Sequence, residues 1–177
     1  MKETFTDEEI ERLRDGCKCI RDLAIIDILN STGVRLSELV GLDIEDIDFE
    51  QRECIVLGKG DKERIAYFDA RTRLHLQEYI SSRKDNNPAL FVSIRQPATR
   101  LTAGGYQLML RKLGNECDVE QCYAHKFRRT MATKAIDKGM PIEQVQVLLG
   151  HEQIATTMLY ANVKQSNVKF SHTKYIG

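Results

Sequence analysis

The sequence has no long apolar run, no internal repeat and no recognisable secretion signal. None of its hydrophobic stretches approaches the about 18 consecutive residues that a membrane-spanning helix needs. The first residues, Met-Lys-Glu-Thr-Phe, lead into an acidic segment where a signal peptide would have an apolar core. These absences argue against a membrane protein and a secreted one, and we expect a cytoplasmic location.

Cysteines are few and odd in number, which argues against a disulfide framework. An odd count in a chain of 177 residues, long enough to bury a sizeable core without cross-links, is typical of reduced thiols in a reducing compartment. We therefore expect free thiols at all five positions, which are Cys17, Cys19, Cys54, Cys117 and Cys122.

The chain also lacks a net charge, because 26 basic and 26 acidic residues give a formal value of +0. This balance counts against a nucleic-acid binder, since neutralising phosphates favours a basic domain. The charges are nevertheless segregated. Seven acids and one base lie between residues 38 and 53, whereas five bases and one acid lie between 125 and 138. Two faces of opposite sign can sum to zero and still present one of them to DNA.

Hydrophobic periodicity predicts a mainly α-helical protein with a small three-stranded antiparallel β-sheet. Thr6 and Glu9 form a capping-box pattern that opens the first helix. Further helices are expected at about 20–30, 36–42, 70–83, 102–113, 124–138, 141–149 and 154–163. Strands are expected at 53–57, 64–68 and 90–92, the first two forming a hairpin. We expect residues 1–177 to form one domain that ends in a short tail, 161–177.

Six residues with reactive or phosphate-binding side chains carry little information when each is taken alone. An arginine three residues before a glutamate is a common surface pair, and a lysine at a hairpin tip is usually solvated. A His-x-x-Arg pair merely shares one helical face, a histidine after Leu-Gly can cap a helix, and a tyrosine in an apolar stretch is usually a core aromatic. The six are Arg35, Lys59, His125, Arg128, His151 and Tyr160.

Taken together in chain order, these residues match the needs of phosphoryl transfer. Guanidinium groups are planar, permanently charged and bidentate, so Arg35 and Arg128 can clamp the non-bridging oxygens of a phosphodiester. Lys59 on a mobile hairpin can protonate a leaving 5′ oxygen. Tyr160 can be the nucleophile, but a tyrosine pKa of about 10 means that a base and positive charge must activate it.

Five short motifs that contain these residues resemble the tyrosine recombinase, or phage integrase, family. Each motif alone is weak, but five in this order, across about residues 5–160, are highly specific. The resemblance is greatest to integrases of phages and conjugative elements of Gram-positive bacteria. The motifs are TGVRLSEL at 32–39, GKGDKER at 58–64, HKFRRT at 125–130, LLGH at 148–151 and TTMLY at 156–160.

The resemblance implies a role for each residue in cutting and rejoining DNA. Arg35 and Arg128 would stabilise the transition state at the scissile phosphate, and Lys59 would be the general acid. His125 would take the proton of Tyr160, which would form a 3′-phosphotyrosine bond. His151 would hydrogen-bond the phosphate or support Tyr160. Glu38 would be a buttress for Arg35. Because the phosphotyrosine keeps the bond energy, the resemblance implies no cofactor and no metal.

The resemblance also implies partners. The substrate would be double-stranded DNA attachment sites, in the integration or excision of a mobile element, with Lys126 and Arg129 as candidate DNA contacts. Family members carry an N-terminal core-binding domain that closes around DNA, and this sequence starts where the catalytic domain would start. We expect the isolated domain to be a monomer with weak DNA affinity, and the full-length protein to form a tetramer on DNA.

Three other interpretations stay open. A DNA-binding remnant would keep the fold without cutting DNA, and a type IB topoisomerase would use the same chemistry without site preference. A zinc-binding module is suggested by Cys117, Cys122 and His125, which supply two soft ligands and an imidazole but no obvious fourth ligand.

Overall fold

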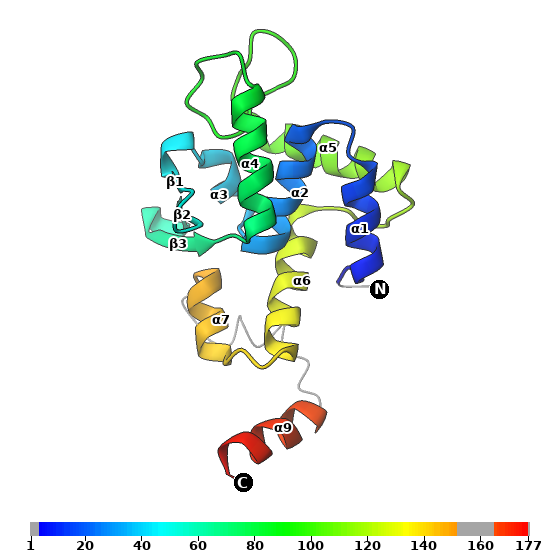
Figure 1. The fold of residues 1–177 in the computed structure, drawn as a ribbon, viewed down its shortest axis with the longest axis vertical. Helices are drawn as coiled ribbons and strands as arrows, with labels where there is room; N and C mark the ends of the chain where they lie inside the picture. The colour runs from blue at the N-terminus through cyan, green and yellow to red at the C-terminus, as the bar shows by residue number, and fades with distance from the viewer. Residues whose placement is uncertain (1–3, 152–164, 177) are drawn as a thin grey trace.

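The computed structural model describes residues 4–151 and 165–176 of the chain. The described residues are mostly helical, with a small sheet on one side (Figure 1). The predicted helix at 154–163, and Tyr160 with it, lies outside the described residues. Within the described ranges, no helix is long and apolar enough to cross a membrane.

Except for the last one, which lies at 165–175 within the stretch predicted to be a tail, the described helices begin and end close to where the sequence patterns predict. They are α1 (Asp7–Gly16), α2 (Ile20–Thr32), α3 (Leu36–Gly41), α4 (Ala70–Ser82), α5 (Ala103–Glu116), α6 (Ala124–Asp137), α7 (Ile142–Leu149) and α9 (Gln165–Tyr175). The predicted capping box is confirmed: the Glu9 N–H donates to the Thr6 hydroxyl over 3.1 Å, and the Thr6 N–H donates to the Glu9 carboxylate over 2.8 Å. Gly33 and Gly150, both in the left-handed conformation, end α2 and α7.

The sheet has three antiparallel strands, as expected, but one of them is not the predicted one. The strands are β1 (Ile47–Asp48), β2 (Glu53–Leu57) and β3 (Glu63–Tyr67), in the order β1-β2-β3, and the one-turn 3-10 helix η2 (Lys59–Asp61) closes the β2–β3 hairpin. The predicted strand at 90–92 is wrong, because Val92 forms only an isolated bridge with Arg100. That segment is buried at all three positions. A fully buried extended segment and a strand have the same apolar sequence signature.

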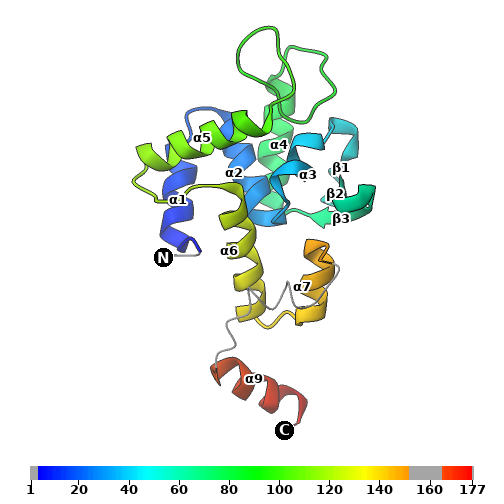
Figure 2. The ribbon, with the colours of Figure 1, turned by 180° about the vertical axis from the view of Figure 1, so that it is seen from behind.

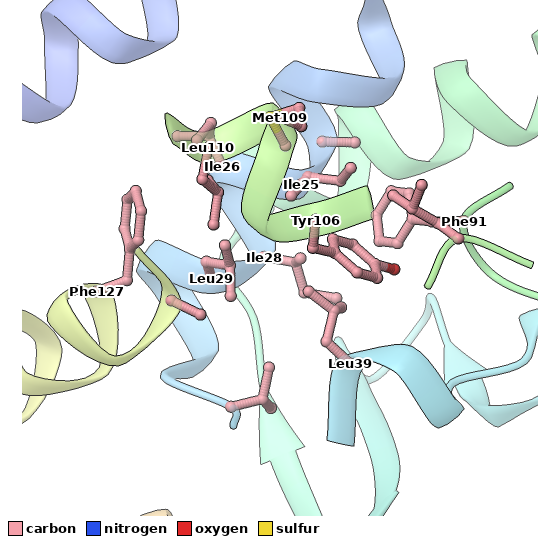
Figure 3. Packing of buried hydrophobic residues seen from close by; sticks show 14 of the residues in the cluster. Ile25, Ile26, Ile28, Leu29, Leu39, Phe91, Tyr106, Met109, Leu110 and Phe127 are labelled. Atoms are coloured by element: carbon pink, nitrogen blue, oxygen red, sulfur yellow. The ribbon is translucent and has the colours of Figure 1, made fainter. Parts of the chain in front are cut away.

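Helix α2 is the centre of the hydrophobic core. Its residues from Ala24 to Leu29 are buried all around the helix, which is the pattern of a helix enclosed by other elements. Helices α1, α4 and α6 pack against it. Figure 3 shows Ile26 of α2 near Leu110 of α5, and Phe127 of α6 belongs to the same cluster. The core thus joins residues from Phe5, near the N-terminus, to Phe127 of α6.

Helix α7 belongs to a separate and smaller apolar cluster. Both views place α7 beside the C-terminal half of α6, away from α1 and α5, with α9 beyond it (Figures 1 and 2). Val168 of α9 is 46% exposed, so this tail residue does not pack into the core. The cluster has three buried members, with three partly buried residues around them: Ala132, Val145 and Leu149, then Met131, Ala135 and Ile136. Because this cluster buries few apolar side chains, polar contacts contribute much of what holds α7 in place.

The core position of α5 predicts a large difference between two of its leucines. Leu110→Ala is expected to lower the free energy of unfolding by about 2–5 kcal/mol, because Leu110 is fully buried and its truncation leaves a cavity. Leu108 lies on the same helix but is 57% exposed, and Leu108→Ala is expected to stay within about 0.5 kcal/mol of the parent. Urea unfolding of both variants measures this. Equal losses would contradict the placement of α5.

Candidate active site

Arg35 lies at the joint between two helices. Gly33 ends α2, and Arg35 is the residue immediately before α3. The side chain of Arg35 is 34% exposed. Its backbone N–H donates to Oε1 of Glu38 over 2.7 Å, and its guanidinium Nη1 lies 3.8 Å from Oε2 of the same carboxylate. The guanidinium therefore faces solvent from a fixed backbone position.

Glu38 is a buried carboxylate held by two arginines. Its side chain is only 1% exposed, and besides Arg35 it accepts two hydrogen bonds from Arg64 of β3, from Nε over 3.0 Å and from Nη2 over 2.8 Å. This bidentate geometry is the strong form of the arginine–carboxylate pair. It supports the proposed role of Glu38 as a buttress for Arg35.

Arg64 has a structural importance that the sequence analysis missed. A signal for it is the alternation along β3, where Arg64 and the buried Ala66 share the inward face while their neighbours are exposed. An arginine on the inward face of a short strand needs a buried partner. The sequence motif alone does not show that this partner is Glu38.

Arg128 is buried within α6 and joins three elements. Only 1% of the residue is exposed. Its Nη1 donates to the carbonyl of Gly33 over 2.7 Å, and its Nη2 donates to the carbonyl of Leu149 over 2.6 Å. Because Gly33 precedes Arg35 by two residues, these contacts bring the two predicted phosphate-clamping arginines to the same turn.

Two histidines complete this cluster. His125 lies one turn before Arg128 on α6, partly exposed; partial desolvation and then the charges of Arg129, Arg128 and Arg35 lower its pKa below the usual 6.5. His151 follows Gly150 and is buried; desolvation and the charges of the surrounding arginines lower its pKa to about 4. Both imidazoles are therefore neutral near pH 7, which is the form that can accept a proton.

The other predicted site residues lie in different surroundings. Lys59 is exposed in η2, at the tip of the β2–β3 hairpin, where Gly60 has a φ of 73°. Arg129 is half-buried beside His125 on α6. The nucleophile candidate, Tyr160, lies outside the described residues, so its distance from the cluster is not part of the structure.

Lys126 does not fit its predicted role as a DNA contact. The residue is 1% exposed, its Nζ donates to the carbonyl of Glu120 over 2.9 Å, and the ammonium lies 4.4 Å from the centroid of the Phe5 ring. The side chain therefore points into the protein, and we withdraw it from the set proposed to contact DNA. Its position in a basic run does not indicate which face of α6 it occupies.

The cysteines are free thiols, and three of them have strongly raised pKa values. Burial raises the pKa of Cys17, Cys54 and Cys122 to about 12, so these thiols stay protonated. Among residues 4–151 and 165–176, no three His, Cys, Asp or Glu side chains are grouped so that they could hold a metal ion. The zinc-module interpretation of Cys117, Cys122 and His125 has no support in this geometry.

The helical fold and the arginine–histidine cluster define the catalytic domain of a tyrosine recombinase. Residues 3–167 match the model of the phage integrase family, to which the chain belongs, so the predicted family and fold are confirmed. The tyrosine recombinase XerC of Corynebacterium glutamicum is 34% identical over 84% of this chain and 49% of its own length. The tyrosine recombinase XerA of Pyrococcus horikoshii is 30% identical over 96% of this chain and 60% of its own length.

Solved structures show the same similarity. A crystal structure of XerA recombinase superposes with a TM-score of 0.84 at 31% identity, covering 100% of this chain and 66% of that chain. The Tn1549 transposon integrase in complex with circular intermediate DNA has a TM-score of 0.81 at 24% identity, covering 98% of this chain and 67% of that chain. The sequence spans about half to three fifths of the two curated relatives.

The close approach of α7 to Arg64 predicts unequal effects of two glycine substitutions. Gly150 and Gly60 have nearly equal φ values, 71° and 73°, so alanine at either position costs about 1–2 kcal/mol of backbone strain. A Cβ atom at Gly150 would also lie 2.5 Å from Cδ of Arg64, whereas one at Gly60 would have nothing within 4 Å. We expect Gly150→Ala to lower the unfolding free energy clearly more than Gly60→Ala in urea titrations. Equal losses would show that Arg64 can move aside freely.

The lowered pKa of His151 predicts a pH dependence of stability. Because that pKa is about 4 in the folded protein and 6.5 is the ordinary value, the unfolded chain binds more protons between these values. The unfolding free energy should therefore fall as the pH drops from 6.5 to 4, and His151→Gln should lose part of this fall. His172→Gln, at an exposed position of α9, is the control and should behave as the parent. Identical pH profiles for the parent and His151→Gln would contradict the prediction.

Proposed function

We propose that this chain is the single catalytic domain of a site-specific tyrosine recombinase that cuts and rejoins DNA through a 3′-phosphotyrosine bond. The observation that carries the proposal is the meeting of Arg35 and Arg128 at the Gly33 turn, beside two histidines of lowered pKa. The two fixed positive charges can bind a phosphodiester, and the neutral imidazoles beside them can accept a proton from the nucleophile.

The residues would divide the reaction among them. Arg35 and Arg128 hold the non-bridging oxygens while Tyr160 attacks phosphorus and loses its proton to His125. The bond to the 5′ oxygen breaks, and Lys59 protonates that oxygen. The new phosphotyrosine has the same type of ester bond as the DNA, so a 5′ hydroxyl of another strand can reverse the reaction without ATP. His151 then contacts the phosphate or the nucleophile from the end of α7.

The burial of Arg128 adds a conformational requirement. Its guanidinium is almost fully enclosed in the described structure, so a phosphate can reach it only if neighbouring groups move aside when DNA binds. Lys59, in contrast, is exposed at a hairpin tip and can approach the leaving oxygen from solvent. We infer that the site is completed on DNA.

The proposed partner is double-stranded DNA. The Tn1549 integrase structure contains circular intermediate DNA, and a XerH structure contains its difH substrate, which supports DNA as the ligand of this fold. Arg129, half-buried next to His125, is the proposed phosphate contact of α6. We further propose that the complete protein acts as a tetramer on its sites in the cytoplasm, in integration or excision, and that the isolated domain is a monomer.

The proposal predicts a covalent DNA–protein adduct that depends on Tyr160. The complete gene product is incubated with a pool of nicked suicide duplexes of random sequence. After cleavage, the short fragment that carries the 5′ hydroxyl diffuses away. Religation is then impossible, and the covalent intermediate accumulates. The adduct is detected on a denaturing gel, and sequencing of the trapped DNA identifies the site. We expect the parent to form it and Tyr160→Phe to form none, because phenylalanine lacks the nucleophilic oxygen.

The outcomes separate the competing functions. An adduct that persists in Tyr160→Phe would refute the assignment of the nucleophile. DNA binding by a well-folded parent that forms no adduct would favour the DNA-binding remnant. Adducts that show no preferred sequence would favour a topoisomerase-like activity.

A further inference from the structure

Arg64 lies where three elements of the proposed site meet. From β3, it donates two hydrogen bonds to Glu38 of α3 and a third, over 2.6 Å, to the carbonyl of Leu148 at the end of α7. Its side chain is 12% exposed, and its stem lies against Gly150. None of the roles assigned above to catalytic groups uses this residue.

Both arms of the β2–β3 hairpin reach the same carboxylate. On the arm that leads to Lys59, a Cβ built on Gly58 would lie 3.6 Å from Oε2 of Glu38. On the returning arm, Arg64 binds both oxygens of Glu38. The arms are joined above this point by the hydrogen bond from Gly58 N–H to the Lys62 carbonyl, 2.8 Å long. Gly58 and Arg64, the residues on either side of the hairpin tip, therefore both lie against the Glu38 carboxylate.

Glu38 also determines where Arg35 lies. It accepts the backbone N–H of Arg35, and its carboxylate is close to the Arg35 guanidinium. One buried carboxylate thus connects a proposed phosphate clamp to the hairpin that carries the proposed general acid. The bidentate pair with Arg64 restricts rotation of the hairpin about that carboxylate, which a single-point lysine contact would not do.

We infer that Arg64 is a positioning residue that sets Lys59 relative to Arg35 through its ion pair with Glu38. The inference rests on the proposed function. A general acid acts only within hydrogen-bond reach of the leaving oxygen, and a displacement of about 1 Å can cost on the order of a hundredfold in rate. An exposed tip lysine has few contacts to hold it, so the anchor below the tip supplies the constraint.

The test compares a leaving oxygen with a leaving sulfur. The complete gene product is assayed on the suicide duplex selected above and on the same duplex with sulfur in place of the bridging 5′ oxygen. A thiol has a pKa of only about 8.5, so a thiolate leaves without a proton and bypasses the general acid. The variants are Arg64→Gln and, as the reference for loss of the acid, Lys59→Ala.

Arg83→Gln is the matched control. Arg83 is also a largely buried arginine, at the end of α4, with hydrogen bonds to Asp85 and to the carbonyls of Ala89 and Leu90. Like Arg64, it binds one carboxylate through Nε and Nη2 and donates to backbone carbonyls, but it lies outside the arginine–histidine cluster. Thermal unfolding of each variant tests whether it is folded at the assay temperature. If Arg64→Gln is not folded, Arg64→Lys, which keeps the positive charge, takes its place.

We expect Arg64→Gln to form the adduct at least about tenfold more slowly than the parent on the oxygen duplex, and at nearly the parent rate on the sulfur duplex. Lys59→Ala should behave in the same way, and Arg83→Gln should match the parent on both. An equal loss on both duplexes, or none on either, would overturn the inference, and so would the same oxygen-specific loss in Arg83→Gln. A folded parent that forms no adduct with any duplex of the pool, so that none can be selected for this test, would instead refute the proposed function.

Discussion

The carbonyl end of α7 is bound by two enclosed guanidinium groups, and the arrangement of the site depends on this contact. Arg64 donates to the carbonyl of Leu148, and Arg128 donates to that of Leu149. The last carbonyls of a helix lack intrahelical partners and carry the negative end of its dipole, so cations are favoured there. Because the apolar cluster under α7 is small, these charge-assisted hydrogen bonds hold the helix that leads to His151.

The same contacts concentrate positive charge in a chain whose net charge is zero. Carbonyl partners stabilise a guanidinium without cancelling its charge, and Glu38 offsets only part of the field of Arg35 and Arg64. Desolvation and, after it, the remaining field lower the pKa of His125 and His151, and the field would favour a phosphate at the same place. Net charge is therefore a weak guide to function here, since the separation of charges decides what the site attracts.

Local signals predicted most of the secondary structure correctly. The capping box at Thr6, the glycine stop at Gly33 and the β-branched run of β2 each act within a few residues, so sequence alone carries them. The predicted strand at 90–92 failed because strand pairing depends on a partner elsewhere in the chain. Lys126 failed for a related reason: the face of a basic helix that is buried depends on what packs against it, in this case Phe5.

The order of most elements and the residue types with which a phosphate could be bound can be read from the amino-acid sequence, because both follow from local pattern and motif. Which of these groups meet depends on the three-dimensional fold. Arg64 and Glu38 are 26 positions apart, Arg64 and Leu148 are 84, and Arg128 and Gly33 are 95. No periodicity spans such separations, and contacts across them form only when the burial of α2 brings α3, α6 and the hairpin together.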